Sequence, residues 1–218
     1  QTFNKYPKQC RDFMIRLVLV GGGGHCKSCI EVIESDGRFT ITGIIDQQIN
    51  NADSCLGVPI IGTDSDMEEI LSQNDMALVT VGQIHTPEIR KKLYQSIKAL
   101  NKAAPVISAA SSIVSSHSII NQGCIVMHGA IINAGAEIGN NVIINSMSLI
   151  EHDVKIGNHC HISTGARING AVNIADECFI GSGAIIHQNI NIGSNAVISA
   201  GAVITKDVVA GDIVRGIL

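Results

Sequence analysis

Aliphatic side chains recur every six residues through the second half of the chain. From Val114 to Ile204 each sixth position is Val or Ile, and no insertion breaks the phase. Six residues fit neither the 3.6-residue helix nor the two-residue alternation of a strand. A fixed short period is typical of a solenoid in which every hexad forms one flat side of a coil. The pattern therefore predicts a parallel β-helix with three hexads in each coil.

Small side chains occupy a second position in most hexads, four residues after the aliphatic one. Examples are Ala130, Ser148 and Cys160. Large residues on the sides and small residues at the corners would fill a narrow prism. Aromatic residues make up only 3% of the chain and Trp is absent, which agrees with coils too thin to hold large rings.

The first half of the chain has the order of a nucleotide-binding α/β unit. An apolar segment at residues 15–20 leads into the glycine run at 21–24, a helix-like stretch and a second apolar segment at 39–45. Glycines in such a turn let the backbone approach a diphosphate at a helix N-terminus. Cys26 replaces the third glycine of the dinucleotide fingerprint, so the turn favours a nucleotide diphosphate over NAD. Asp46, at the strand end, is expected either to bind the nucleoside or to cap a turn.

These two patterns predict two domains. A Rossmann-like domain with a short parallel sheet is expected over residues 14–104, and the β-helix over residues 105–218. Within the first domain we expect another strand at residues 77–81 and a polar helix at residues 87–100. Residues 1–13 are interpreted as an extension without an assigned role.

Charge and composition exclude several classes of protein. The net charge of −4 and the pI near 6.0 offer no basic surface for nucleic acid. No apolar run reaches the ~18 residues of a membrane span, and no secretion signal is recognisable, so we expect a cytoplasmic protein. The seven cysteines are an odd number and are interpreted as small buried side chains. This includes Cys26 and Cys29, although their spacing is also that of a redox pair.

One histidine of the repeat region stands between two acidic residues. Glu151 precedes His152 and Asp153 follows it. A neutral imidazole beside a carboxylate can take a proton from an amine or hydroxyl, while the carboxylate orients the ring. A solvated turn would have the same local sequence, so the spacing alone leaves both interpretations open.

The residues together resemble the bacterial sugar O/N-acyltransferase family. The resemblance rests on the glycine–histidine turn at 21–25, the short α/β unit, the hexads with Ile-Glu-His-Asp at 150–153, and His161 nine residues after His152. This family includes sialic acid O-acetyltransferases and acetyl-CoA-dependent N-acetyltransferases of UDP- or dTDP-linked 4-amino-6-deoxy sugars. The resemblance implies a left-handed β-helix and a homotrimer with active sites between subunits. It also implies direct acetyl transfer in bacterial surface-glycan biosynthesis, including lipopolysaccharide.

The resemblance also implies roles for individual residues. His152 matches the catalytic base and Asp153 its acidic partner, with no metal. The acetyl group and coenzyme A are expected at His161, Gly170, Ser182 and Ala200. The sugar nucleotide is expected at Gly21, Gly23, Gly24, His25, Asp46 and Gly82.

Three other functions stay open. A sugar O-acetyltransferase of the sialic acid type would use the same fold and base, whereas an inactive trimeric scaffold would need only the solenoid. A zinc enzyme of similar fold would need three histidines that converge at bond distance. The separation of His117 and His152 is one residue short of two coils, so the phase disfavours a zinc site.

Overall fold

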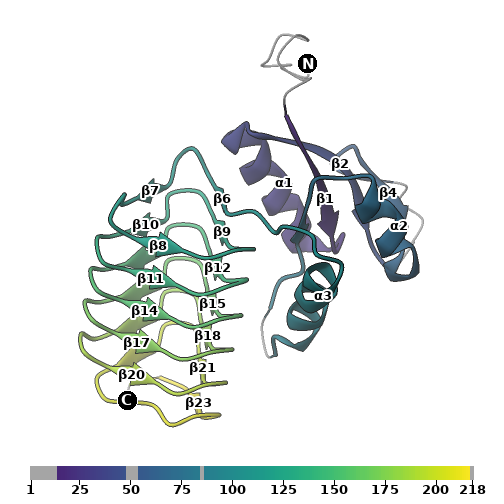
Figure 1. Cartoon of the computed structure of the whole chain (residues 1–218). Coiled ribbons are helices and arrows are strands. Elements are labelled where there is room, and N and C mark those ends of the chain that lie inside the picture. The colour runs from purple at the N-terminus through teal and green to yellow at the C-terminus, as the bar shows by residue number, and fades with distance from the viewer. Residues whose placement is uncertain (1–13, 48–53, 84–85, 217–218) are drawn as a thin grey trace.

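The structure is a computed structural model that describes residues 14–47, 54–83 and 86–216. An α/β domain comes first, and a left-handed parallel β-helix of hexapeptide repeats stands beside it (Figure 1). Both parts of the predicted fold class are thus confirmed. The extension predicted at residues 1–13 lies outside the described residues.

The N-terminal sheet has the strand order β3-β4-β2-β1-β5. All neighbouring pairs are parallel except β3 with β4. The strands are β1 (Ile15–Val20), β2 (Phe39–Ile45), β3 (Ser54–Cys55), β4 (Val58–Gly62) and β5 (Met76–Val79). Because β1 lies between β2 and β5, the order of the strands reverses there, and ligands of open α/β sheets bind at such a point.

Helices cover both faces of this sheet. They are α1 (Gly24–Asp36), the 3-10 turn η2 (Asp64–Asp66), α2 (Met67–Ser72) and α3 (Glu88–Ala99). Alternate residues of β1 point to opposite sides: Leu17 packs with α1 and the solenoid, and Val18 packs with α2 and α3. The strand expected at 77–81 ends at Val79, and the two residues that follow it, Thr80 and Val81, line a cavity.

Each coil of the solenoid contributes one two-residue strand to each of three sheets. The first face contains β6 (Ile107–Ser108), β9 (Ile125–Val126), β12 (Ile143–Ile144), β15 (His161–Ile162), β18 (Phe179–Ile180), β21 (Val197–Ile198) and β23 (Ile213–Val214). The second face contains β7 (Ile113–Val114), β10 (Ile131–Ile132), β13 (Leu149–Ile150), β16 (Arg167–Ile168), β19 (Ile185–Ile186) and β22 (Val203–Ile204). The third face contains β8 (Ile119–Ile120), β11 (Glu137–Ile138), β14 (Lys155–Ile156), β17 (Asn173–Ile174) and β20 (Asn191–Ile192).

Three edges join these faces, and we name each by what lies on it. The Ser182 edge joins the first face to the second, the His152 edge joins the second to the third, and the α3 edge joins the third back to the first. Residues 18 apart stack in register, as Ile132 does on Ile150. The second residue of each strand points inward, so Ile144 and Ile162 are fully buried, as the hexads predict.

The N-terminal domain packs on the first face and along the α3 edge. Ile125 and Ile143 of the first face share one hydrophobic core with α1 and β1. From α3, the ring of Tyr94 meets that of His159 edge to face, with centroids 5.7 Å apart, and Lys91 forms an ion pair with Glu177. The second and third faces are left uncovered by this domain (Figure 1).

Neither membrane-spanning helices nor candidate metal clusters occur in the described ranges. Each helix seen in residues 14–47, 54–83 and 86–216 is too short or too polar to cross a bilayer. In the same ranges no three His, Cys, Asp or Glu side chains are grouped so that they could hold a metal ion.

Candidate active site

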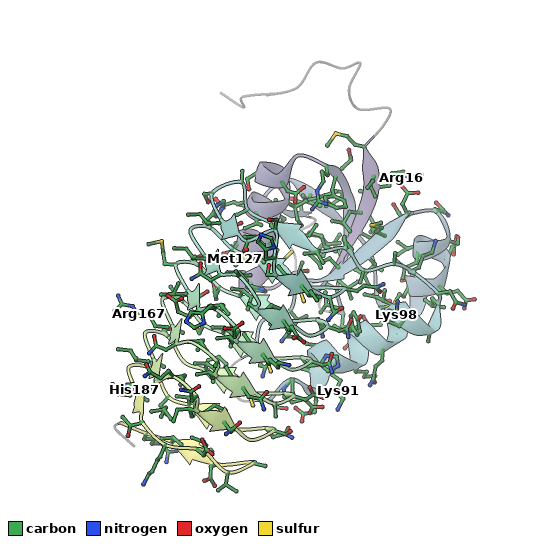
Figure 2. All side chains as sticks on the ribbon, turned by 60° about the vertical axis from the view of Figure 1, so that its left-hand side comes forward. Arg16, Lys91, Lys98, Met127, Arg167 and His187 are labelled. Carbon is green, nitrogen blue, oxygen red and sulfur yellow. The ribbon has the colours of Figure 1, made fainter. Side chains whose placement is uncertain are left out.

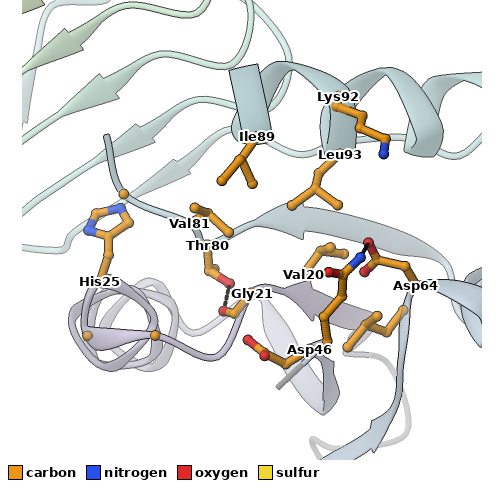
Figure 3. A pocket seen from close by; sticks show the side chains of 15 residues that line it. Val20, Gly21, His25, Asp46, Asp64, Thr80, Val81, Ile89, Lys92 and Leu93 are labelled. Atoms are coloured by element: carbon orange, nitrogen blue, oxygen red, sulfur yellow. Dashed lines mark hydrogen bonds between the residues drawn. The ribbon is translucent and has the colours of Figure 1, made fainter. Parts of the chain in front are cut away.

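A cavity of about 400 Å³ opens at the carboxyl ends of β1, β2 and β5 (Figure 3). Gly21 follows β1, Asp46 follows β2, and Gly82 follows β5 by three residues. The cavity therefore lies where the strand order reverses. All six residues expected to hold a sugar nucleotide line it, and their role in binding stays a prediction.

The glycines of the turn differ in what they do. Gly21 has φ +108°, and a Cβ there would lie 2.3 Å from Cγ2 of Val81, so position 21 requires glycine. A Cβ on Gly23 or Gly24 would meet nothing within 4 Å. These two residues leave the N-terminus of α1 open to the cavity, and its unpaired N–H groups and positive dipole end favour an anion such as a diphosphate.

Asp46 supports the turn as well as lining the cavity. Its Oδ2 accepts a hydrogen bond from the N–H of Gly22. The hydroxyl of Thr80 donates to the carbonyl of Gly21 at 2.6 Å. Residues from all three strand ends therefore hold the glycine turn in one conformation.

The remaining wall of the cavity was not foreseen from the sequence. Ile89, Lys92 and Leu93 of α3 lie opposite the glycine turn (Figure 3). Beside them Nε2 of Gln47 donates to Oδ2 of Asp64 at 2.6 Å. Only the docking of α3 onto the sheet brings Lys92 to the cavity, and the polar helix pattern contained no signal for it.

His25 and His161 connect this cavity with the first face of the solenoid. Their ring centroids are 6.4 Å apart. Burial, followed by the charge of Arg90, lowers the pKa of His25 to about 4 and that of His161 to about 3. Both rings are consequently neutral at pH 7.

The tautomer of His161 follows from its partners. Its Nδ1 is 2.8 Å from the carbonyl oxygen of Gln83, which can only accept, so Nδ1 carries the proton. Its Nε2 then accepts from the side-chain amide of Asn145 at 3.2 Å. The amide oxygen of Asn145 accepts from the N–H of Ser146 at 2.8 Å, which fixes the orientation of the amide. Neither Gln83 nor Asn145 was identified from the sequence.

His152 and Asp153 form an exposed pair on the His152 edge. Nδ1 of His152 lies 2.9 Å from Oδ2 of Asp153, with 65% and 68% of the two side chains exposed. Because a carboxylate accepts, the proton lies on Nδ1 and Nε2 remains available as a base. Glycines of the adjacent coils make room for the pair: a Cβ at Gly135 would lie 2.4 Å from Oδ1 of Asp153, and one at Gly170 would lie 2.7 Å from Cε1 of His152.

The residues expected at the coenzyme lie on three different parts of the prism. Gly170 is on the His152 edge, His161 is buried on the first face, and Ser182 and Ala200 stack one coil apart on the Ser182 edge. The hydroxyl of Ser182 lies 2.9 Å from that of Ser163. Along this edge a Cβ at Gly165, Gly183 or Gly201 would meet nothing within 4 Å. Small residues thus leave this edge open.

Within one chain the His152 edge is remote from the cavity. It joins the two faces that the N-terminal domain leaves uncovered, whereas His161 lies under that domain on the first face. Figure 2 shows Arg167 of the second face, and His187 where the His152 edge begins, on the side away from Lys91 and Lys98 of α3. His152 and the cavity therefore do not meet in a single chain.

Three family models match the chain. The PglD N-terminal domain matches residues 16–97, the bacterial transferase hexapeptide (six repeats) matches residues 135–170, and the hexapeptide repeat of succinyl-transferase matches residues 172–206. Comparison with curated protein sequences gives no match.

Solved structures of three proteins share the whole fold. The acetyltransferase domain of PglB from Neisseria gonorrhoeae, in complex with acetyl coenzyme A, is 31% identical, with a TM-score of 0.87 over 93% of this chain and 97% of that chain. A mutant of perosamine N-acetyltransferase from Caulobacter crescentus, in complex with CoA and GDP-perosamine, is 28% identical, with a TM-score of 0.85 over 90% and 91%. WeeI from Acinetobacter baumannii, at 24% identity and a TM-score of 0.80 over 93% and 97%, shows the same fold.

Proposed function

The chain belongs to the bacterial sugar O/N-acyltransferase family, and from this membership we propose that it transfers an acetyl group from acetyl-CoA to the 4-amino group of a nucleotide-linked 4-amino-6-deoxy sugar. The observation that carries the proposal is the exposed His152–Asp153 pair, whose Nε2 is available as a base, in a chain that also holds a glycine-lined cavity. Relatives bound to acetyl coenzyme A, or to CoA and GDP-perosamine, support both substrate classes.

The sugar nucleotide is proposed to occupy the cavity at the strand ends. Its diphosphate lies at Gly23 and Gly24, at the N-terminus of α1, where N–H groups and the helix dipole favour anions. Asp46 and Gly82 face the nucleoside side. We propose UDP or dTDP as the carrier, and the GDP-perosamine of the Caulobacter enzyme adds GDP to the nucleotides to be tested.

His152 is proposed to act as the general base in direct transfer. Its Nε2 accepts the proton that the sugar nitrogen loses on bonding to the acetyl carbon, and Asp153 stabilises the resulting imidazolium. The ring returns this proton to the coenzyme sulfur as the carbon–sulfur bond breaks, and no acyl-enzyme forms. The amide of Asn145, beside His161, is the side-chain donor we propose for the developing oxyanion.

A complete site is proposed to need two chains of a homotrimer. The His152 edge of one chain would lie beside the cavity and His161 of the next, because the two are remote within one chain. Ile113 of the second face is 63% exposed, and Leu149, Ile185 and Val203 of that face are partly exposed. This uncovered apolar stripe supports association of the solenoids.

The deciding experiment offers the protein acetyl-CoA with UDP-, dTDP- and GDP-linked 4-amino-6-deoxy sugars. Free thiol release and the mass of the sugar product are measured together. We expect acetylation of at least one amino sugar, and no product from the matching 4-hydroxy sugar. Acetylation of hydroxyl acceptors alone, such as sialic acid, would show an O-acetyltransferase instead, and no product with any acceptor in an intact trimer would indicate a scaffold.

A further inference from the structure

Arg90 of α3 is a buried cation without an acidic partner in the described part of the chain. Only 2% of it is exposed. Its Nη1 donates to Oε1 of Gln83 at 2.7 Å, and its Nη2 donates to the carbonyl of Asn141 on the α3 edge. Uncompensated burial lowers the pKa of Arg90 to about 10, yet the group stays charged at pH 7. Burial of a charge without a counter-ion is costly, so this arrangement requires an explanation other than stability.

Unpaired polar atoms concentrate around the same residue. Among the described residues, the buried side-chain atoms without a hydrogen-bond partner are Nε of Arg90, Nε2 of Gln83 and Nε2 of His25. Buried polar groups in proteins are normally paired, and exceptions cluster where function requires them. All three belong to the junction between the cavity, α3 and the first face of the solenoid.

This junction is hydrogen-bonded to His161 through Gln83. Arg90 holds the side chain of Gln83, and the backbone carbonyl of Gln83 accepts the Nδ1 proton of His161. With that proton held on Nδ1, Nε2 of His161 is the acceptor that orients the amide of Asn145. Removal of Arg90 would release the side chain of Gln83, and a shift of the His161 proton from Nδ1 to Nε2 would then put a donor opposite Asn145.

We propose that Arg90 is a positioning residue for the acetyl transfer: acting through Gln83, it holds His161 in the Nδ1-protonated form that orients Asn145. This inference rests on the proposed function for its effect on rate, but its effect on His161 is independent of any activity. The sequence shows Arg90 only as one cation of a polar helix, and its role depends on the docking of α3.

The test compares Arg90→Met, Gln83→Ala and Lys91→Ala in the full chain. Methionine preserves much of the buried volume of Arg90 without its charge or donors. The Gln83→Ala variant removes the link to Arg90 but retains the backbone carbonyl. Lys91→Ala is the matched control, because Lys91 lies on the same helix and also bridges to the solenoid, through Glu177, without contacting Gln83. The ¹⁵N shifts of the His161 ring give its tautomer, and steady-state kinetics give kcat and both KM values.

We expect Arg90→Met and Gln83→Ala to shift His161 away from the pure Nδ1-protonated form and to lower kcat about 10- to 100-fold. The KM values should change much less, and Lys91→Ala should leave both the tautomer and kcat near those of the parent. The proposal is overturned if His161 keeps its tautomer in both variants, or if Lys91→Ala lowers kcat as much as they do. Should Arg90→Met not fold, Gln83→Ala alone decides between these outcomes. A changed tautomer in a protein that acetylates no sugar would refute the proposed function while preserving the link from Arg90 to His161.

Discussion

The ring of His152 lies directly against the backbone of Gly170 in the next coil. A Cβ at position 170 would come within 2.7 Å of Cε1 and 2.8 Å of Nε2 of His152. Gly170 was expected to contact the coenzyme, and that role remains a prediction. Its contact with His152 is a second reason why position 170 holds glycine, and kinetics can separate the two.

Gly170→Ala should lower kcat about 10- to 100-fold, because the added methyl displaces the base from its position against the coil. If Gly170 serves His152, the KM for acetyl-CoA should change little, and the substitution should have no further effect in a His152→Ala background. A coenzyme role alone would raise that KM and leave kcat near its original value. Gly211→Ala is the control for folding: its φ of +79° strains an alanine, but a Cβ there meets nothing within 4 Å.

His152→Ala should reduce kcat by roughly 10²–10⁴-fold, the usual contribution of a general base. The side chain is 65% exposed, so thermal unfolding should remain close to that of the parent. Asp153→Asn should cause a smaller loss, since the ring would keep a hydrogen-bond partner at Nδ1 but lose the charge that stabilises the imidazolium. A loss below tenfold in folded His152→Ala protein would remove His152 from the mechanism.

Gly23→Val should raise the KM for the sugar nucleotide strongly and leave the KM for acetyl-CoA nearly unchanged. The valine side chain would enter open space that the diphosphate is proposed to fill, and no protein atom lies within 4 Å of its Cβ position. Gly21→Val should behave differently and destabilise the fold, because its backbone has φ +108° and Val81 blocks the Cβ. If Gly23→Val raised both KM values equally, this would argue against separate sites for the two substrates.

Stability should fall as the pH drops below about 6.5. The folded-state pKa values of His25, about 4, and His161, about 3, lie below the ordinary value of 6.5. Below pH 6.5 these two histidines therefore bind protons in the unfolded chain but not in the folded chain. Their full contribution to the free energy of unfolding is present only above that pH. The loss should approach roughly 1.4 kcal/mol per pH unit for each ring between its two pKa values.

Urea unfolding between pH 7.5 and 4.5 measures this dependence. His161→Asn, which can still donate to the carbonyl of Gln83, should flatten it, and substitution of the exposed His187 serves as the control. An unchanged slope in folded His161→Asn protein would contradict the assignment of His161 as a buried neutral ring.

Mixing two impaired variants should restore activity at low sugar-nucleotide concentration if the site is shared between chains. His152→Ala chains retain the cavity, and Gly23→Val chains retain the base, so a mixed trimer would contain some intact sites. Co-refolding the two and measuring thiol release tests this, and light scattering measures the oligomer. Mixed trimers without recovered activity, or a fully active monomer, would contradict a site shared between chains.

The sequence by itself determined the solenoid, because the hexad is a local pattern. Each inward Ile, such as Ile144 or Ile162, contacts its counterpart 18 residues away whatever the rest of the chain does. The contact between Gly170 and His152 could also have been predicted from the repeat. Residues 18 apart stack in neighbouring coils, and these two residues are 18 apart. The glycine turn and the strand ends, from Gly21 to Asp46, were also determined locally, since a parallel βαβ unit brings them to one edge of the sheet.

Only the tertiary structure determined the contacts between the two domains. Arg90 reaches Asn141 across 51 residues, and His161 donates to Gln83 across 78 residues. Neither contact follows from the hexad repeat, because Arg90 and Gln83 lie in the N-terminal domain. They depend on how α1 docks on the first face and α3 on the α3 edge, and this docking is set by side-chain packing between elements rather than by any pattern within one of them. For the same reason the sequence assigned His152, His161 and Ser182 to a site between subunits without placing them on the prism, and the structure puts them on an edge, a face and another edge of one chain.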